Sequence, residues 1–244
     1  MRKALHLLAV SSLFCTGLVY AEGSHWTYSG ETGPAHWAEV NSDYHVCAEG
    51  KNQSPVNLTD FVEADLPALT FDYQTQAKEI LNNGHTILIN MAEGSSLGVD
   101  GLTLPAMQFH FHSPSENQIN GESFPIEMHI VHGDGVGNFA VIAVMFKEGE
   151  ANPALESLWA NMPTNSGEHR GLENADLSGL LPEDKDYYRF TGSLTTPPCS
   201  EGLRWLVLKN PVTASKAQIK QFQKVMQHPN NRPLQPINAR VILQ

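Results

Sequence analysis

The sequence predicts a mainly β protein with a single domain, built on a large, twisted, mostly antiparallel central sheet with short peripheral helices. Two observations predict this class. Short apolar or alternating runs recur along the chain, and turn-forming pairs such as Asp100-Gly101 and Asn120-Gly121 separate them. Residues 22–244 also contain no internal repeat and no long linker of proline, glycine and serine, which indicates one domain.

Individual elements follow from the same patterns. A first helix is expected after Asn152 and Pro153, which supply an N-cap and a first-turn proline, and Pro163 ends it. A second helix is expected after Ser215, which forms a capping box with Gln218 ahead of an apolar face. The runs expected to form strands are 86–91, 107–112, 126–131, 139–146 and 203–208.

The N-terminus has the pattern of a secretory signal peptide. Arg2 and Lys3 form a basic start, an apolar stretch follows, and small residues near Ala21 resemble a cleavage site. The alternative is a retained membrane anchor. The apolar stretch is short for a membrane span and is interrupted by polar residues, which argues against an anchor. We therefore expect a signal peptide at residues 1–21, a domain at residues 22–244, and a periplasmic or secreted protein.

Charge and cysteine content narrow the possible partners. The chain carries 26 acidic and 15 basic residues, a net charge of −11, which argues against nucleic acid and anionic membranes. Cleavage would remove Cys15, and Cys47 and Cys199 are then expected to form one disulfide in an oxidising compartment. A free catalytic thiol is the alternative. The sequence leaves a monomer and a homodimer both open.

Three histidines form a candidate metal site. His110 and His112 are two residues apart, so on a strand both imidazoles share one face. Such a pair is a weak signal in a chain with 11 histidines, but His129 on a second expected strand adds a third imidazole. Three neutral imidazoles match a catalytic Zn²⁺ site with one open position. The alternative is a structural or storage site, although structural zinc usually has four protein ligands.

Two polar residues are expected to support these ligands. Gln108 and Glu127 lie two residues before His110 and His129, on the same strand faces. A metal-bound imidazole usually donates its second N–H to such a group. His132 lies three residues beyond His129, so strand alternation places it on the opposite face, and we interpret it as a structural histidine.

Seven blocks of sequence follow one another over nearly all of the chain after the signal peptide: 26–28 with 33–37, 53–57, 82–86, 108–112, 127–129, 193–199 and 231–233. In this order they resemble the alpha-class carbonic anhydrases. The resemblance implies that family's fold and a zinc enzyme, a carbonate dehydratase of the lyase class. Its substrate would be a small molecule, because zinc-bound hydroxide in this family converts carbon dioxide reversibly to bicarbonate and a proton.

The resemblance also implies catalytic roles. The Thr195 hydroxyl would accept a hydrogen bond from zinc-bound hydroxide and donate its own to Glu116. His85 would be the proton shuttle, since histidine titrates near neutral pH. A surface histidine after the Gly84 turn is the alternative for His85.

A substrate pocket follows from the resemblance as well. A bridge between Cys47 and Cys199 would hold the loop that carries Thr195. Asn117 stands where many family members carry histidine, which affects the packing behind Glu116 and not the mechanism. The pocket would combine an apolar wall with two polar residues, and its members would be Val131, Val141, Leu194, Trp205, Thr196 and Asn83.

Two other functions remain open at this point. A non-catalytic binding domain could keep the fold, but such relatives typically lose a zinc histidine, and this chain has all three. A metallo-esterase could use the same hydroxide on activated esters. Metal content, and a comparison of ester with carbon dioxide turnover, would separate these possibilities.

Overall fold

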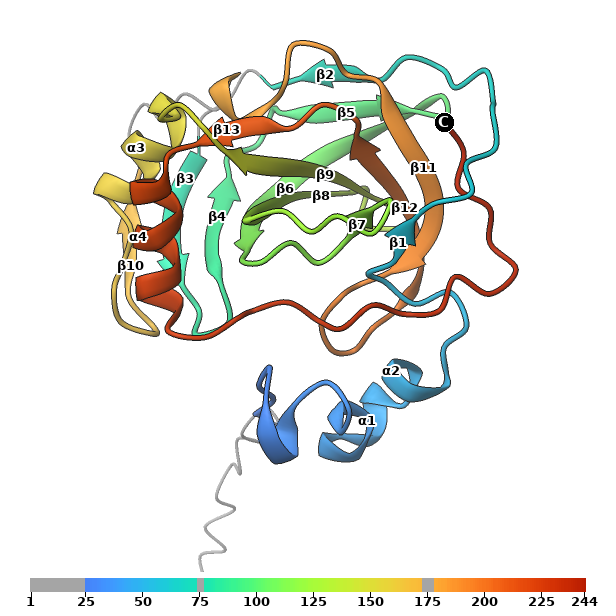
Figure 1. Cartoon of the computed structure of the whole chain (residues 1–244), viewed down its shortest axis with the longest axis horizontal. Helices are drawn as coiled ribbons and strands as arrows, with labels where there is room; N and C mark the ends of the chain where they lie inside the picture. Colours follow the sequence, from blue (N-terminus) through green and yellow to red (C-terminus); the bar gives the residue numbers. More distant parts are fainter. Residues whose placement is uncertain (1–24, 74–76, 173–177) are drawn as a thin grey trace, which may run out of the picture.

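A computed structural model describes residues 25–73, 77–172 and 178–244, so the predicted signal peptide lies outside the described residues. Within these residues, eleven strands form one mixed sheet, and two short strands pair separately (Figure 1). The order along the main path of the sheet is β10-β3-β4-β6-β8-β9-β12-β11, with β2, β5 and β13 joined at its sides. The prediction of a mainly β fold with a large central sheet is confirmed.

The strands have the following bounds. The separate parallel pair consists of β1 (Asn57–Leu58) and β7 (Gln118–Ile119). The strands of the large sheet are β2 (Thr70–Asp72), β3 (Ala77–Asn82), β4 (Ile87–Met91), β5 (Ser96–Val99), β6 (Leu102–His112), β8 (Ile126–Gly133), β9 (Phe139–Glu148), β10 (His169–Gly171), β11 (Tyr187–Ser193), β12 (Glu201–Leu208) and β13 (Val212–Ala214).

The centre of the sheet is antiparallel. Strand β6 pairs with β4 on one side and β8 on the other, and β8 pairs with β9, each in antiparallel register. Beyond β9 the direction changes, because β12 and β13 both pair with it in parallel. The runs predicted as strands fall in β4, β6, β8, β9 and β12.

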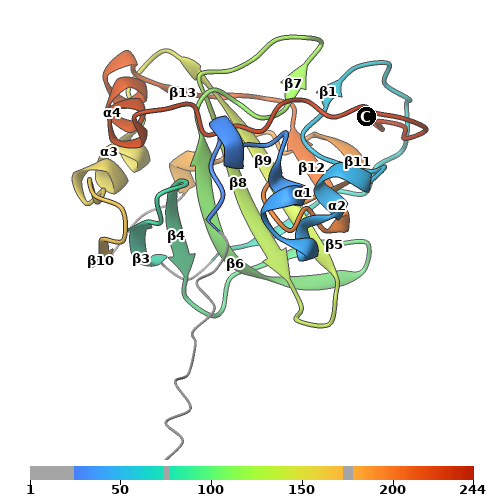
Figure 2. The same ribbon diagram turned by 90° about the horizontal axis from the view of Figure 1, so that it is seen from below.

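Both predicted helices are present with their caps. The Asn152 carboxamide oxygen accepts hydrogen bonds from the amides of Ala154 and Leu155, and Ser215 and Gln218 form a capping box. These helices, α3 (Pro153–Ala160) and α4 (Lys216–Met226), lie together on one side of the molecule. Two shorter helices, α1 (Trp37–Val40) and α2 (Val46–Glu49), lie apart from them (Figures 1 and 2). Three 3₁₀ turns are η1 (Gly30–Thr32), η2 (Ser42–Tyr44) and η3 (Ser178–Leu180).

The two faces of the central strands bury different side chains. On β8, Met128 and Ile130 pack into the larger apolar cluster, which also contains residues of α3 and α4. Val141 and Trp205 belong to a second apolar cluster on the other side. Side chains alternate along a strand, so His129 between Met128 and Ile130 faces this second side. No helix in the described part of the chain is both long enough and apolar enough to span a membrane.

Candidate active site

The three predicted ligands lie on two neighbouring strands. Strands β6 and β8 are antiparallel, and their register places His110 directly opposite His129. His112 lies two residues along β6, on the same side of the sheet. One nitrogen from each of the three imidazoles lies within 4.8 Å of the others. Their backbone placement follows from strand register alone, so no loop has to be ordered to bring the rings together.

Each imidazole donates its other ring N–H to a fixed acceptor. Two of these acceptors, the side chains of Gln108 and Glu127, are the residues predicted from strand spacing. The third is a backbone carbonyl that follows α4. The bonds run from His110 Nδ1 to Gln108 Oε1 at 2.8 Å, from His112 Nδ1 to the Asn230 carbonyl at 2.7 Å, and from His129 Nε2 to Glu127 Oε1 at 2.8 Å.

These bonds leave Nε2 of His110, Nε2 of His112 and Nδ1 of His129 free to face one centre. Nε2 of His112 is buried and has no hydrogen-bond partner among the described residues. Burial lowers the pKa of all three imidazoles, which keeps them neutral and able to donate a lone pair. A neutral three-imidazole donor set with a remaining open side fits a tetrahedral Zn²⁺ ion.

Asn230 was missed by the sequence analysis. Its carbonyl holds His112, while its own carboxamide accepts from the Ser113 amide at 2.8 Å and donates to the Phe111 carbonyl at 2.9 Å. Any residue type has a backbone carbonyl, so the identity of residue 230 does not reveal that it accepts this hydrogen bond. Asn230 is also 118 residues away from His112 in the sequence. The adjoining block at 231–233 was the only sequence signal near it.

A buried carboxyl group lies next to the ligands. Glu116 Oε2 is 3.5 Å from His112 Nε2 and 3.8 Å from His129 Nδ1, and Glu116 Oε1 accepts a 2.8 Å hydrogen bond from the Arg232 amide. Burial raises the pKa of Glu116 to about 8, although the Arg232 amide and the Thr195 side chain both lower it. Thr195 and Glu116 therefore interact directly beside the three imidazoles.

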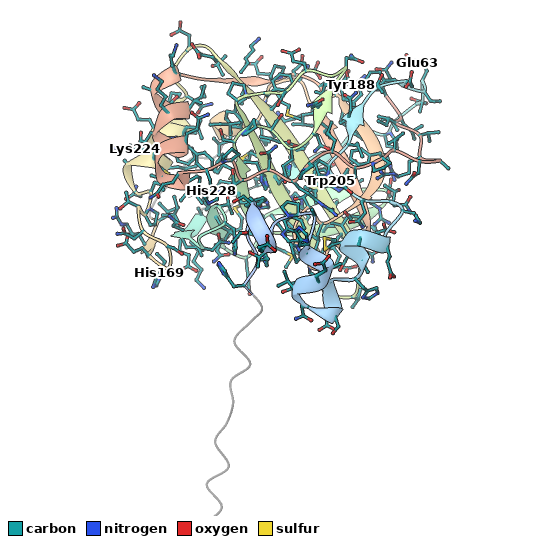
Figure 3. The ribbon with its side chains drawn as sticks, turned by 60° about the horizontal axis from the view of Figure 1, so that its bottom comes forward. Glu63, His169, Tyr188, Trp205, Lys224 and His228 are labelled. Atoms are coloured by element: carbon teal, nitrogen blue, oxygen red, sulfur yellow. A yellow bond between two sulfur atoms is a disulfide. The ribbon has the colours of Figure 1, made fainter. Side chains whose placement is uncertain are left out.

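A cavity of about 100 Å³ opens beside two of the ligands. The Trp205 indole donates to the Ser193 carbonyl at 3.0 Å, and its ring meets that of His129 edge-on at 4.8 Å between centroids. Figure 3 shows Trp205 within the body of the molecule, whereas the labelled His169 and Lys224 lie at its periphery. The lining combines the predicted apolar wall with polar groups: Gln108, His110, His129, Val131, Val141, Leu194, Thr195, Thr196 and Trp205.

Asn83 and His85 lie outside that lining. The Asn83 carboxamide accepts hydrogen bonds from the amides of His85 and Thr86 at 2.9 and 2.8 Å, and so closes the turn between β3 and β4. The His85 ring stacks on Trp26 and is half-buried. Burial lowers the pKa of His85, and the neighbouring His25 and His228 lower it further.

Cys47 and Cys199 form the expected disulfide, which joins α2 to the loop after β11. The Arg232 guanidinium lies behind this bridge. It donates to the Cys47 carbonyl at 2.9 Å and to the Ser54 carbonyl at 2.8 Å. Gln53 donates to the Cys199 carbonyl at 3.0 Å. The loop that carries Thr195 is therefore joined at Cys199 to the N-terminal segment by the disulfide and by the hydrogen bond from Gln53.

His132 lies away from the three ligands, as strand alternation predicts. Its Nε2 shares a 2.6 Å hydrogen bond with the Tyr73 hydroxyl, and the two rings stack. Burial lowers the pKa of His132 to about 4 and raises that of Tyr73, so both side chains stay neutral. His132 is not part of the group of potential metal ligands found in the described residues.

A large sheet here presents three neutral imidazoles, a buried carboxyl group and a partly apolar cavity, an arrangement typical of metalloenzymes. Comparison with known proteins names the family. Residues 32–244 match the family described as eukaryotic-type carbonic anhydrase. The chain belongs to this family, which confirms the resemblance seen in the sequence.

Individual relatives are carbonic anhydrases as well. The chain is 46% identical to a carbonic anhydrase of Pectobacterium atrosepticum, with 99% of each chain covered. It is 44% identical to one from Neisseria gonorrhoeae, with 100% of this chain and 98% of the relative covered. The solved alpha-carbonic anhydrase of Thermovibrio ammonificans, a complex with the inhibitor sulfanilamide, superimposes with a TM-score of 0.88 at 49% identity, covering 91% of this chain and all of that one. The protein is therefore a lyase, a carbonate dehydratase that acts on carbon dioxide and bicarbonate.

Proposed function

We propose that the protein catalyses the zinc-dependent, reversible hydration of carbon dioxide to bicarbonate and a proton, with Zn²⁺ held by His110, His112 and His129. The observation that carries this proposal is the convergence of three neutral imidazole nitrogens beside a partly apolar cavity. A bound zinc ion supplies a Lewis acid that lowers the pKa of a coordinated water from about 15.7 to about 7.

The apolar wall suits the substrate. Carbon dioxide is linear and carries no net dipole, so Val131, Val141 and Leu194 can hold it without a hydrogen bond. Trp205 completes this wall, and its indole N–H is already bonded to the Ser193 carbonyl, so the indole presents carbon rather than a donor. Thr196 lies in the same lining and would contact the more polar product, bicarbonate.

Thr195 and Glu116 would orient the attacking oxygen. A threonine hydroxyl can donate one hydrogen bond and accept others. When Glu116 is ionised its carboxylate can only accept, so the Thr195 proton would point toward it and the Thr195 oxygen would be left to accept from the nucleophile. The Thr195 backbone N–H would meet an oxygen of bicarbonate.

His85 would carry the released proton to solvent. Its imidazole is half-buried, while His25 and His228 beside it are exposed. Histidine is suited to this step because it gains and loses a proton near neutral pH. His85 would hold the proton until water or buffer removes it.

We further propose that the protein is exported, with residues 1–21 removed and residues 22–244 forming the domain. The disulfide between Cys47 and Cys199 supports this, because such bridges persist in oxidising compartments. Mass spectrometry of the exported protein should find Glu22 as its first residue. A chain recovered with its N-terminal segment intact would contradict the cleavage.

The central test measures zinc and turnover on the same sample. Zinc-loaded protein, chelator-stripped protein and stripped protein with zinc restored are compared by stopped-flow hydration of carbon dioxide. We expect about one zinc per chain and activity that disappears and returns with the metal. Stoichiometric zinc with no rate above that of buffer would end the proposal.

A further inference from the structure

Asn117 donates two hydrogen bonds to Glu127, the residue that supports His129. Its side chain is fully buried. Its backbone amide donates to Glu127 Oε2 at 2.8 Å, and its carboxamide Nδ2 donates to Glu127 Oε1 at 2.7 Å. Its carboxamide oxygen accepts from the Val56 amide at 3.1 Å. Asn117 thus holds both oxygens of one carboxyl group and is itself held by the segment before β1.

The Asn117 side chain contacts the same Glu127 oxygen, Oε1, that supports the predicted ligand His129. Glu127 Oε1 accepts from His129 Nε2 at 2.8 Å and from Asn117 Nδ2 at 2.7 Å. The terminal torsion of a glutamate side chain is broad, so a carboxyl group with one partner can rotate. Here the amide of Glu116, at 2.7 Å from Oε2, and the two donors of Asn117 define the plane of the group.

We infer that Asn117 is a positioning residue of the metal centre, which orients Glu127 and, through it, the imidazole of His129. This role presupposes the zinc centre proposed above. The resemblance to the family predicts that asparagine in place of histidine at this position affects the packing behind Glu116. The side-chain bonds of Asn117 run instead to Glu127 and to the Val56 amide.

An asparagine serves this role in a specific way. Its carboxamide is neutral and keeps both N–H donors, so the bond to Glu127 Oε1 does not depend on a tautomer. The same carboxamide must accept from Val56 with its oxygen, which leaves only one orientation that satisfies both partners. A purely structural role for Asn117 would need only the Val56 bond, and zinc affinity distinguishes the two roles.

The test uses Asn117→Leu, which keeps the approximate size of the side chain and removes its hydrogen bonds. Zinc affinity is measured by competition with a chromophoric chelator. Direct partners of metal-ligating histidines are typically worth about 10- to 100-fold in metal affinity, and Asn117 acts through such a partner, so we expect Asn117→Leu to weaken zinc binding by about 10-fold, the lower end of that range. Asn117→His, which restores an N–H donor, should recover most of the affinity.

A matched control separates orientation from general destabilisation. Asn152 is also a buried asparagine, but it caps α3 and donates to the Gly179 carbonyl, away from the ligands. Asn152→Leu should lower the melting temperature of the metal-free protein and leave zinc affinity unchanged. If Asn117→Leu does not fold, Asn117→Ser serves in its place, because a serine hydroxyl is too short to reach Glu127 Oε1.

The outcomes are distinct. Weaker zinc binding by the Asn117 variant, with recovery in Asn117→His and unchanged affinity in Asn152→Leu, supports the role. Wild-type affinity in Asn117→Leu or Asn117→Ser overturns it, and so does an equal loss of affinity in Asn152→Leu. A wild-type protein that binds no zinc would instead remove the proposed metal centre on which this role depends.

Discussion

His85 stacks face to face on Trp26, with ring centroids 3.8 Å apart and planes inclined by 10°. Tyr28 lies between this pair and His228, at 6.5 Å from the His85 ring and 6.3 Å from the His228 ring. His25 adds a third imidazole 6.2 Å from His85. The indole therefore holds His85 next to two exposed imidazoles, those of His25 and His228.

Replacing His85 tests its proposed part in proton transfer. His85→Ala should lower the rate of carbon dioxide hydration in weak buffer by roughly 10²-fold, since positioned proton donors and acceptors contribute on that scale. Added imidazole should restore the rate, because a small base can replace the missing side chain. An unchanged rate in weak buffer would mean that protons leave by another route.

Removing a ligand tests the metal centre. His129→Ala should abolish stoichiometric zinc binding and activity together, because it leaves only two imidazoles to hold the ion. His169→Ala is the matched control, since His169 is exposed and lies at the edge of the sheet on β10 (Figure 3). Metal analysis and stopped-flow rates are measured on both. A fully active, zinc-loaded His129→Ala protein would show that the ligands are different.

Thr195 should matter for rate and not for metal binding. Thr195→Val keeps the shape of the side chain and removes the hydroxyl that would connect Glu116 to the nucleophile. We expect kcat/KM to fall by about 10²- to 10³-fold, the usual effect of losing one oriented hydrogen bond at a reacting oxygen. Zinc content measured on the same sample should equal that of wild type. A rate within a few-fold of wild type would exclude the orienting role.

The disulfide should contribute to stability. Cys47 and Cys199 are 152 residues apart in sequence, so the bridge closes a long loop and restricts the unfolded chain. Replacing both cysteines by serine should lower the free energy of unfolding by about 2–5 kcal/mol. Denaturant titration of the oxidised wild type and the double variant measures the difference. Equal midpoints and slopes would show that the bridge adds nothing to stability.

His132 should make the protein less stable in acid. Its folded pKa is about 4, below its ordinary value of 6.5, so between these values the unfolded chain binds a proton that the folded chain does not. Stability is therefore lost as pH falls through this window, by roughly 3 kcal/mol in total. His132→Gln, which does not titrate, should lose less stability over the same window. Parallel acid profiles for the two proteins would contradict the assignment.

Strand periodicity predicted most of what determines the site. A spacing of two residues predicts that His110 and His112 share one face of a strand. The alternation of side chains along the next strand favours His129 over His132 as the third ligand. The predicted placement of these side chains on the strands is confirmed, because side-chain alternation is a local property of a strand. The roles of Thr195, Glu116 and His85 came from resemblance to a family, since nothing in their spacing indicates chemistry.

Other features depended on contacts between distant parts of the chain. The carbonyl of Asn230 and the stacking of His85 on Trp26 both join segments that local patterns leave unrelated. The parallel pairing of β12 with β9 is similar, because periodicity identifies a strand and does not determine the direction of its neighbour. Asn117 was visible as a departure from the family, but only its bonds to Glu127 gave it a role.

The carbonyl that holds His112 also bears on the order of events during biogenesis. Asn230 lies near the C-terminus, so a chain still being synthesised or exported can present three imidazoles while His112 lacks its acceptor. The fully oriented site exists only after the last segment has docked. In the proposed zinc centre, firm metal capture would therefore follow completion of the fold, and a chain truncated before Asn230 would hold the ion more loosely.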